Sequence, residues 1–281
     1  MVKISIHTTM TKPDERMDPW KESMNCYNDL ADEVVITGED WPEQFRWDHI
    51  GKTFNEGLKK STGDWAIRMD LDYLFHENDL EYIRDFIEKN NNELAIAFPK
   101  RQFFTYDRYQ LQSRICIAVN KKKYPEIQLN GGGDLCFPTI EGKLIDVNRI
   151  PLSKAPVWNY DMMFKTKEII KYERHRFGKA WYEYFNNWGI FGGDTEKEAY
   201  DAWYSWVKEK YKKHVFKIKL EDHPIYIQEK LKNLDNNQFG YSGFGIKDNT
   251  KFDQIELGNR FCKQQQLKQK LYLLIKLQLS I

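Results

Sequence analysis

The first hundred residues alternate short apolar runs with longer segments whose apolar positions recur at helical spacing. The runs are rich in β-branched residues and predict strands at residues 2–6, 33–37, 65–69 and 93–98. The segments between them predict helices at residues 21–30, 47–60 and 79–89. In the second of these helices, Ile50, Phe54 and Leu58 fall on one face. This alternation predicts an α/β fold in which helices cover a parallel sheet.

The second half of the chain has a different pattern. Residues 103–119 are rich in aromatic residues and predict extended backbone. Beyond them, helical spacing dominates at residues 166–184, 195–211 and 225–234. We therefore expect an α/β core at residues 1–165 and a mostly helical C-terminal region at residues 166–281 that packs on the core.

The last predicted helix carries Leu267, Leu271 and Leu274 on one face, among interspersed Lys and Gln residues. Such an amphipathic helix can dock on its own domain, on a second subunit in a homodimer, or on a membrane surface as a peripheral contact. Because its polar face is not strongly basic, the sequence favours docking on the domain or on a partner subunit.

Composition then narrows the function class. The 43 Lys and Arg residues nearly balance the 42 Asp and Glu residues, which argues against a protein that mainly neutralises a nucleic-acid backbone. The 4 cysteines are scattered without a Cys-x-x-Cys pair, so we expect reduced thiols. The N-terminal apolar run lacks the core of a signal peptide, and no run of about 18 apolar residues predicts a membrane span. We therefore expect a cytoplasmic protein.

The chemistry-bearing feature is Asp70-Leu71-Asp72, directly after the third predicted strand. In parallel sheets the ligand binds beyond the carboxyl ends of the strands, so His7 to Thr9, Gly38 to Asp40 and the residues after Met69 should share one crevice. Two carboxylates two positions apart in extended backbone point the same way, and a hard divalent cation relieves their repulsion. The residues alone leave open whether they form a metal–diphosphate site or a pair of solvated loop acids.

Part of the sequence resembles the core of GT-A glycosyltransferases of the family 2 type. The resemblance rests on an Asn-x-Gly helix, a Gly-Asp turn, an apolar strand and an Asp-x-Asp, which here are Asn55 to Leu58, Gly63-Asp64, Trp65 to Met69 and Asp70 to Asp72. It is close over residues 2–100 and looser to about residue 175. It implies a GT-A (Rossmann-like) mixed, mainly parallel sheet flanked by helices, with a helical C-terminal extension. It also implies a metal-dependent, inverting transfer of a sugar from a nucleotide-diphosphate sugar to an acceptor hydroxyl on a glycan or glycoconjugate.

The resemblance also implies roles for individual residues. Asp70 lies near the ribose and the metal, and Asp72 is the main ligand of Mn²⁺ or Mg²⁺. The nucleotide-binding candidates are His7, Thr8, Thr9, Glu39, Asp40, Lys52, Asn55 and Asp70. For two of them the sequence fits a purely structural role equally well. Lys52 can be an exposed lysine on a helix, and His7 can be a loop histidine whose hydrogen bonds are made within the protein.

Further candidates lie in the second half of the chain. Asp134, after three glycines, is the first candidate for the general base that deprotonates the acceptor, and Asp161 is a weaker one. Asn159 stands where related transferases often have a metal-binding His, and an amide oxygen can still bind the metal. Lys165 can reach phosphate oxygens as a point charge, or it can be a surface lysine at a helix start.

Two alternatives compete with glycosyl transfer. A nucleotidyltransferase that makes nucleotide sugars shares the layered fold, but it would normally need a glycine-rich loop after the first strand. That loop here, from His7 to Lys12, contains no glycine. A non-catalytic carbohydrate-binding protein would not require an Asp-x-Asp at the edge of a parallel sheet.

Overall fold

The computed structural model describes residues 1–130, 137–248 and 260–278. The strands are β1 (Ile4–Thr9), β2 (Glu33–Thr37), β3 (Trp65–Arg68), β4 (Tyr73–Leu74), β5 (Ala95–Thr105), β6 (Arg108–Asn120), β7 (Gln128–Leu129), β8 (Pro138–Ile140), β9 (Lys143–Leu144), β10 (Val157–Asn159) and β11 (Phe216–Lys217). The α-helices are α1 (Trp20–Leu30), α2 (Asp48–Lys60), α3 (Leu80–Lys89), α4 (Lys167–Phe185), α5 (Glu196–Tyr211), α6 (Ile225–Lys232), α7 (Phe239–Ser242) and α9 (Arg260–Gln278), and the 3₁₀ turns are η1 (Glu77–Asp79), η3 (Gly189–Phe191) and η4 (Leu220–Asp222).

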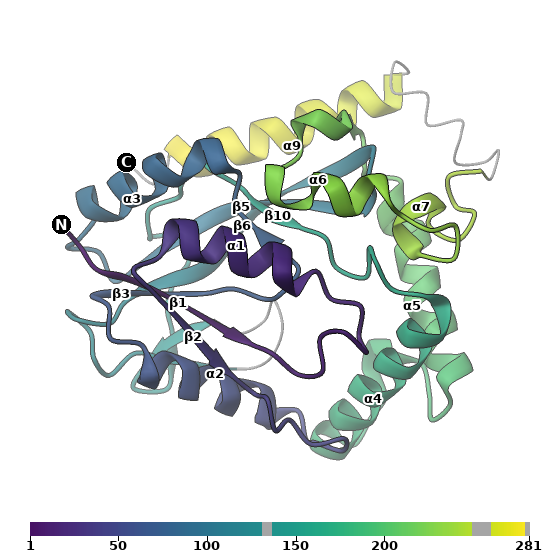
Figure 1. The fold of residues 1–281 in the computed structure, drawn as a ribbon, viewed down its shortest axis with the longest axis horizontal. Coiled ribbons are helices and arrows are strands. Elements are labelled where there is room, and N and C mark those ends of the chain that lie inside the picture. The colour runs from purple at the N-terminus through teal and green to yellow at the C-terminus, as the bar shows by residue number, and fades with distance from the viewer. Residues whose placement is uncertain (131–136, 249–259, 279–281) are drawn as a thin grey trace.

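One mixed sheet forms the centre of the molecule (Figure 1). Its order is β2-β1-β3-β6-β5-β10-β4, with β11 paired to β6. The strands β2, β1 and β3 run parallel, β6 runs antiparallel to both β3 and β5, and β10 returns parallel to β5. The fold class predicted from the sequence is therefore confirmed.

Helices cover both faces of this sheet. Alternate side chains of β3 point to opposite faces, as strand geometry requires. Trp65 and Ile67 pack with α1, α3 and α6, whereas Ala66 packs with α2. Both groups of contacts are buried, so the sheet and the helices on its two faces form a three-layer core.

The antiparallel hairpin β5–β6 differs from the simple alternation that the sequence pattern predicts. The predicted fourth strand does not lie beside the third, because β6 is inserted between β3 and β5. The two strands of this hairpin have 11 and 13 residues. Their backbone groups pair with each other directly, so no crossover helix is needed between them.

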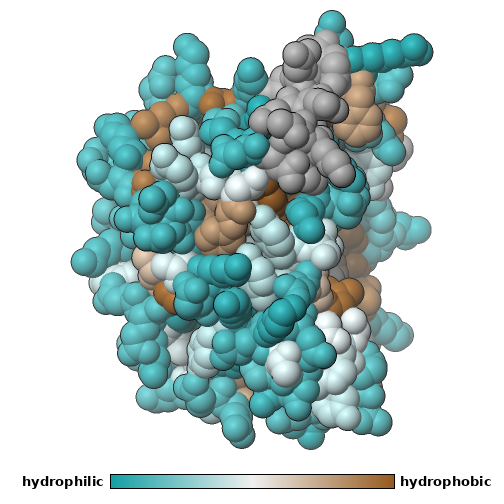
Figure 2. All heavy atoms as spheres, turned by 90° about the vertical axis from the view of Figure 1, so that its right-hand side faces the viewer, coloured by the Kyte–Doolittle hydropathy of each residue, from teal (hydrophilic) through white to brown (hydrophobic). Residues whose placement is uncertain are grey.

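The helices α4 and α5 form a hairpin at the side of the sheet where β1 and β3 end (Figure 1). Figure 2 shows the face on this side of the molecule, where hydrophilic side chains predominate and hydrophobic ones gather in small patches. Beneath it, Ile170, Trp203 and Phe239 pack with Phe104 of β5 in a separate aromatic core. Within the described residues, no helix is long and apolar enough to cross a membrane.

Candidate functional site

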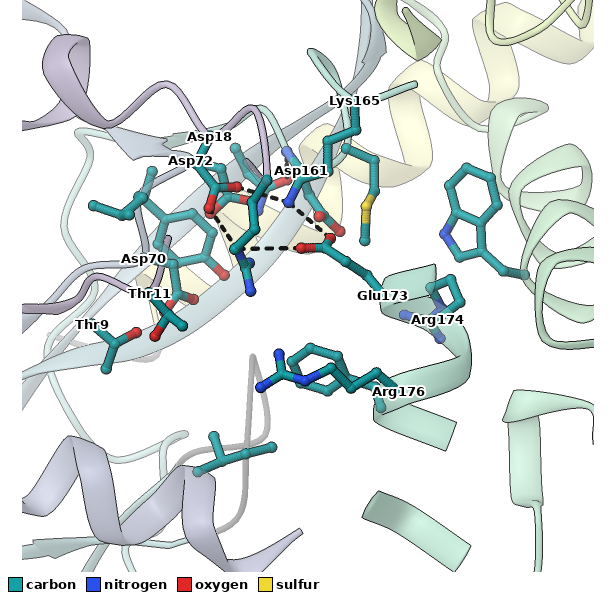
Figure 3. A pocket seen from close by; sticks show the side chains of 18 of the residues that line it. Thr9, Thr11, Asp18, Asp70, Asp72, Asp161, Lys165, Glu173, Arg174 and Arg176 are labelled. Atoms are coloured by element: carbon teal, nitrogen blue, oxygen red, sulfur yellow. Dashed lines mark hydrogen bonds and ion pairs between the residues drawn. The ribbon is translucent and has the colours of Figure 1, made fainter. Parts of the chain in front are cut away.

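A cavity of about 500 Å³ lies between the carboxyl ends of the central strands and the α4–α5 hairpin (Figure 3). Its polar lining includes Thr9, Thr11, Arg16, Asp18, Asp70, Asp72, Gln102, Asn159, Asp161, Lys165, Glu173, Arg174 and Arg176. Its apolar wall includes Trp41, Trp47, Ile50, Phe54, Phe177, Ile190, Phe191, Trp203 and Trp206. Side chains from both halves of the chain therefore build one site, at the edge where parallel-sheet geometry predicts it.

The acidic loop between β3 and β4 forms one wall of this cavity. It is a tight turn, in which the backbone N–H of Tyr73 donates to the carbonyl oxygen of Asp70 at 2.8 Å. Neighbouring strands hold both ends of the loop. The backbone N–H of Met69 donates to the carbonyl of His7 at 3.0 Å, and the backbone N–H of Tyr160 donates to the carbonyl of Asp72 at 2.9 Å. The two aspartates are therefore displayed from a fixed backbone.

Helix α1 supports the same loop from the buried side. The Ser23 hydroxyl donates to the carbonyl of Leu71 at 2.6 Å. The Tyr27 hydroxyl lies 2.6 Å from the carbonyl oxygen of Asp70 and 2.9 Å from that of Tyr73. Ser23 and Tyr27 are four residues apart, so one helical face carries both contacts, and both residues are fully buried.

Asp70 and Asp72 have different surroundings. The Nη1 atom of the buried Arg68 lies 3.1 Å from both carboxylate oxygens of Asp70, while the guanidinium packs over the ring of Phe54. Asp72 receives no such cation at close range within the described residues. Burial in the cavity wall, then the charges of Asp161 and Asp70, raise the pKa of Asp72 well above its ordinary value.

Carboxylates crowd together in one part of the cavity wall. Asp72 and Asp161 repel each other, and Asn159 lies between them in chain order, with its Oδ1 accepting from the backbone N–H of Asp161 at 3.2 Å. Within residues 1–130, 137–248 and 260–278, no three His, Cys, Asp or Glu side chains lie together so that they could hold a metal ion by themselves. Carboxylate and amide oxygens are nevertheless the kind of ligand that Mg²⁺ and Mn²⁺ prefer, and these cations commonly take further oxygens from a phosphate-bearing substrate.

Beside the carboxylates lies a buried ring of alternating charges. The Lys165 Nζ atom is 2.8 Å from Asp18 and 2.8 Å from Glu173. The Arg16 Nε atom is 2.8 Å from Asp18 and 3.2 Å from Glu173. Although burial alone would raise the pKa of Asp18, Lys165 and Arg16 lower it. Burial likewise disfavours the charged form of Lys165, but Glu173 and Asp18 raise its pKa.

Two further arginines of α4 face the cavity (Figure 3). Arg176 donates from Nε to the carbonyl of Glu43 at 2.7 Å and packs over the ring of Phe45, so it ties the segment after β2 to α4. Arg174 packs over the ring of Phe191, and its Nε atom is buried without a hydrogen-bond partner among the described residues. Burial lowers the pKa of Arg174, while the charges of Asp161 and Glu173 oppose this shift.

The structure brings together six of the predicted site residues. The predicted residues that line the cavity are Thr9, Asp70, Asp72, Asn159, Asp161 and Lys165. Lys165 is not the surface lysine that the sequence allows, because it is buried in the ion-pair ring.

Other predicted residues lie away from the cavity lining. His7 and Thr8 are buried in the core, since β1 alternates and α2 crosses it closely at Gly57. Lys52 is exposed and forms an ion pair with Asp48 at 2.7 Å, so it is the exposed helix lysine that the sequence also allows. The side-chain amide of Asn55 donates to the carbonyl of Leu129 at 2.6 Å and accepts from the backbone N–H of Leu129 at 2.7 Å. Asn55 therefore holds β7 rather than facing the cavity.

Three predicted residues have no described place in the site. Glu39 and Asp40 are exposed and outside the cavity lining, although Trp41 next to them is part of it. Asp134 lies outside the described residues.

Sequence reasoning missed the cationic side of the site. Arg16 and Asp18 lie in an irregular loop. Glu173, Arg174 and Arg176 lie in a helix that contains many other charged residues. No motif distinguishes these charges from solvated ones. Only the burial of Glu173 and Lys165 shows that they belong to a site.

A known protein family matches the part of the chain that contains the acidic loop. Residues 44–148 match the sequence profile of the family described as Glycosyl transferase family 2. No curated protein matches the chain. Among solved structures, a crystal structure of S. aureus TarS is 10% identical with a TM-score of 0.34, and the alignment covers 95% of this chain and 54% of that one.

A second structure, of S. aureus TarS 1-349, is 9% identical with a TM-score of 0.31, and the alignment covers 88% of this chain and 90% of that one. The chain spans about half the length of the first TarS structure. The profile match includes α2, β3, the acidic loop and the β5–β6 hairpin. Residues 44–148 thus carry the sequence signature of the glycosyl transferase family 2, and the predicted resemblance of this chain to that family is confirmed.

Proposed function

We propose that this protein transfers a sugar from a nucleotide-diphosphate sugar to an acceptor hydroxyl, and that the 500 Å³ cavity is its active site. One observation carries the proposal: the acidic loop falls inside the segment that matches the family, and it also forms a wall of the cavity. The glycine-free loop after β1 continues to disfavour a nucleotidyltransferase. A donor of this class is consistent with the predicted cytoplasmic location, which stays a prediction.

The donor's diphosphate is proposed to lie beside Asp72 and Asn159, which would hold Mn²⁺ or Mg²⁺ together with phosphate oxygens. A divalent cation bound there would neutralise charge on the departing nucleoside diphosphate. Thr9 and Thr11 then line the path toward the nucleoside, at the end of β1. Asp70, whose carboxylate lies 3.1 Å from the guanidinium of Arg68, is proposed to accept from the ribose hydroxyls.

The cationic side of the cavity complements this anionic group. Lys165 and Arg16 are already matched by Asp18 and Glu173, so we assign them to holding the cavity wall. Arg174 has a buried Nε without a hydrogen-bond partner among the described residues, and a guanidinium binds phosphate through its planar fork. We therefore assign Arg174, rather than Lys165, to the departing diphosphate.

The acceptor is proposed to enter along the aromatic wall formed by Trp47, Phe191, Trp203 and Trp206. Aromatic faces cover the apolar faces of sugars, while indole N–H groups can donate to hydroxyls. In an inverting transfer, a general base must lie within hydrogen-bond reach of the acceptor hydroxyl. Asp161 is the described candidate, and Asp134 is the candidate outside the described residues. Substituting each with Asn separates them, because loss of the base abolishes transfer and preserves binding of the nucleoside diphosphate.

The direct test is Asp72→Asn, with Asp85→Asn on the exposed face of α3 as the matched control. Calorimetry with UDP, GDP, CDP and dTDP, each with and without Mn²⁺, should show metal-dependent binding of at least one nucleotide. Asp72→Asn should weaken it by at least about tenfold, because a ligand oxygen is lost. The proposal fails if no nucleotide binds, or if Asp72→Asn binds as tightly as the control.

A further inference from the structure

Helix α9 lies across the sheet at a distance from the proposed active site, along the top of the molecule in Figure 1. It is held by uncharged side chains. Gln266 donates to the carbonyl of Val215 at 2.6 Å, Gln269 donates to the carbonyl of Lys213 at 3.0 Å, and Gln269 also accepts from the backbone of Leu111 at 2.9 Å. Cys262 is fully buried on the same side of the helix. One face of α9 is therefore docked on β6 and β11.

The opposite face of α9 is apolar and open to solvent. Leu267 is 59% exposed, Leu271 46%, Leu274 53% and Ile275 52%. Their spacing of four, seven and eight residues places them in one stripe along the helix, turned away from Gln266 and Gln269. Exposed leucines are ordinary one at a time, but a continuous stripe on an already docked helix indicates a surface that binds something.

The charges around this stripe all have one sign. Residues 260–278 contain Arg260, Lys263, Lys268, Lys270 and Lys276 and no Asp or Glu. Within the described residues, no acidic side chain forms an ion pair with Arg260, Lys263, Lys268 or Lys270. Lys270 packs over the ring of Phe216 at the docked side, whereas the helical positions of Arg260, Lys263 and Lys268 place them within or beside the apolar stripe.

The chain that packs against α9 adds to this charge. Residues 208–219, which run from the end of α5 through β11, contain Lys208, Lys210, Lys212, Lys213, Lys217 and Lys219 and a single acid, Glu209. The whole protein carries a net charge of only +1, so this positive field is local. This segment packs on the docked face of α9, where the carbonyls of Lys213 and Val215 accept from Gln269 and Gln266, so it lies behind the helix and not around the apolar stripe.

We propose that the outward face of α9 binds the surface of anionic lipid membranes. Leu267, Leu271, Leu274 and Ile275 enter the boundary between headgroups and acyl chains. Arg260, Lys263 and Lys268 beside them meet the negative headgroups. The contact is peripheral, and it leaves the cavity and its acidic loop untouched.

A second copy of the chain fits this surface less well. In a two-fold dimer the same patch meets itself, so two helices without a single acidic residue would face each other. Like charges brought together across an interface oppose binding. An anionic bilayer supplies both things that the patch lacks, an apolar phase and negative charge.

The experiment measures co-sedimentation of the full chain with vesicles of phosphatidylcholine alone and with 30% phosphatidylglycerol, a composition chosen for surface charge. Binding is expected to the anionic vesicles at least about tenfold more tightly than to the neutral ones, and to fall as salt is raised. The triple variant Leu267→Ser, Leu271→Ser and Ile275→Ser should lose this binding. The matched control, Leu144→Ser with Ile225→Ser, removes equally exposed apolar side chains elsewhere and should keep it.

Three results would overturn the proposal. They are no binding to either vesicle, equal binding to both, or a dimer in light scattering that the triple variant turns into a monomer.

Unfolding temperatures check that the variants fold. Because the substituted side chains are exposed, their stability should change little. Binding of nucleoside diphosphate with Mn²⁺ should be the same in the triple variant and the parent. A failure at the membrane can therefore be told apart from a failure of the proposed activity.

Discussion

At the scale of single residues, the site depends on backbone groups that other side chains hold in place. The two aspartates of the acidic loop were identifiable from sequence, because their spacing and position after a strand are local. Their support was not identifiable. Tyr27 is more than forty positions away, and nothing in the helix pattern of α1 shows that its hydroxyl meets the carbonyls of Asp70 and Tyr73.

Replacing Tyr27 by Phe should loosen this loop without emptying the core. We expect unfolding to become easier by about 1–2 kcal/mol, because two buried carbonyls lose their donor. We also expect weaker binding of nucleoside diphosphate with Mn²⁺, measured by calorimetry. Tyr226→Phe, which removes a hydroxyl contact to Asp29 near the surface, is the control. Unchanged nucleotide binding in Tyr27→Phe would show that the loop does not need this support.

The buried ion-pair ring makes a second prediction at this scale. Lys165→Met should destabilise the fold by about 3–5 kcal/mol in urea unfolding, because Asp18 and Glu173 lose their shared cation while buried. Adding Glu173→Gln should recover part of the loss.

The exposed pair of Lys197 with Asp201 provides the comparison for this ring. Lys197→Met should leave stability nearly unchanged, because exposed ion pairs contribute little. Similar losses in Lys165→Met and Lys197→Met would mean that the ring is solvated.

At the scale of elements, the helices and the first three strands followed the predictions within a few residues, because their apolar spacing is a local property. The order of the strands did not follow, since β6 pairs between β3 and β5. Contacts between elements also decided which predicted residues reach the cavity. His7 was expected near the ligand, but Gly57 lets α2 approach β1 so closely that His7 is enclosed.

Gly57→Ala tests this close approach. Alanine favours a helix by about 1 kcal/mol over glycine, so an unhindered site would gain stability. Here the added Cβ would lie 2.7 Å from Nδ1 of His7, and the helix must shift away from the sheet. We therefore expect a net loss of stability in urea unfolding, whereas Glu56→Ala at the exposed neighbouring position should cost little. A stabilised Gly57→Ala protein would contradict this packing.

At the scale of the whole molecule, the C-terminal helices complete the site that the α/β core begins. The division at residue 165 stays a prediction, but the cavity needs both sides, with carboxylates from the sheet edge and cations and aromatic rings from α4 and α5. The helices also enclose titratable groups. Burial lowers the pKa of His7 and of His214 to about 3, and that of His223 to about 4.

These histidines predict a loss of stability in mild acid. Each folded-state pKa lies below the ordinary value of 6.5, so the unfolded chain binds more protons between about pH 6.5 and 4. Stability is therefore fully present above pH 6.5 and falls as the pH drops through this window. His214→Phe, which keeps the stacking on Phe104, should reduce the loss between pH 7 and 4.5 by at least about 1 kcal/mol in urea unfolding. An equal loss in the variant and the parent would show that His214 is not responsible.

The sequence by itself determined the helices, the early strands, the acidic loop and its family resemblance, because each depends on residues close together in the chain. The tertiary structure alone decided the strand order, the burial of Lys165 with Glu173, and the outward turn of the apolar and basic sides of α9. These features depend on the burial of charges and on contacts between distant segments. A local pattern carries no record of which face of a helix another element will cover.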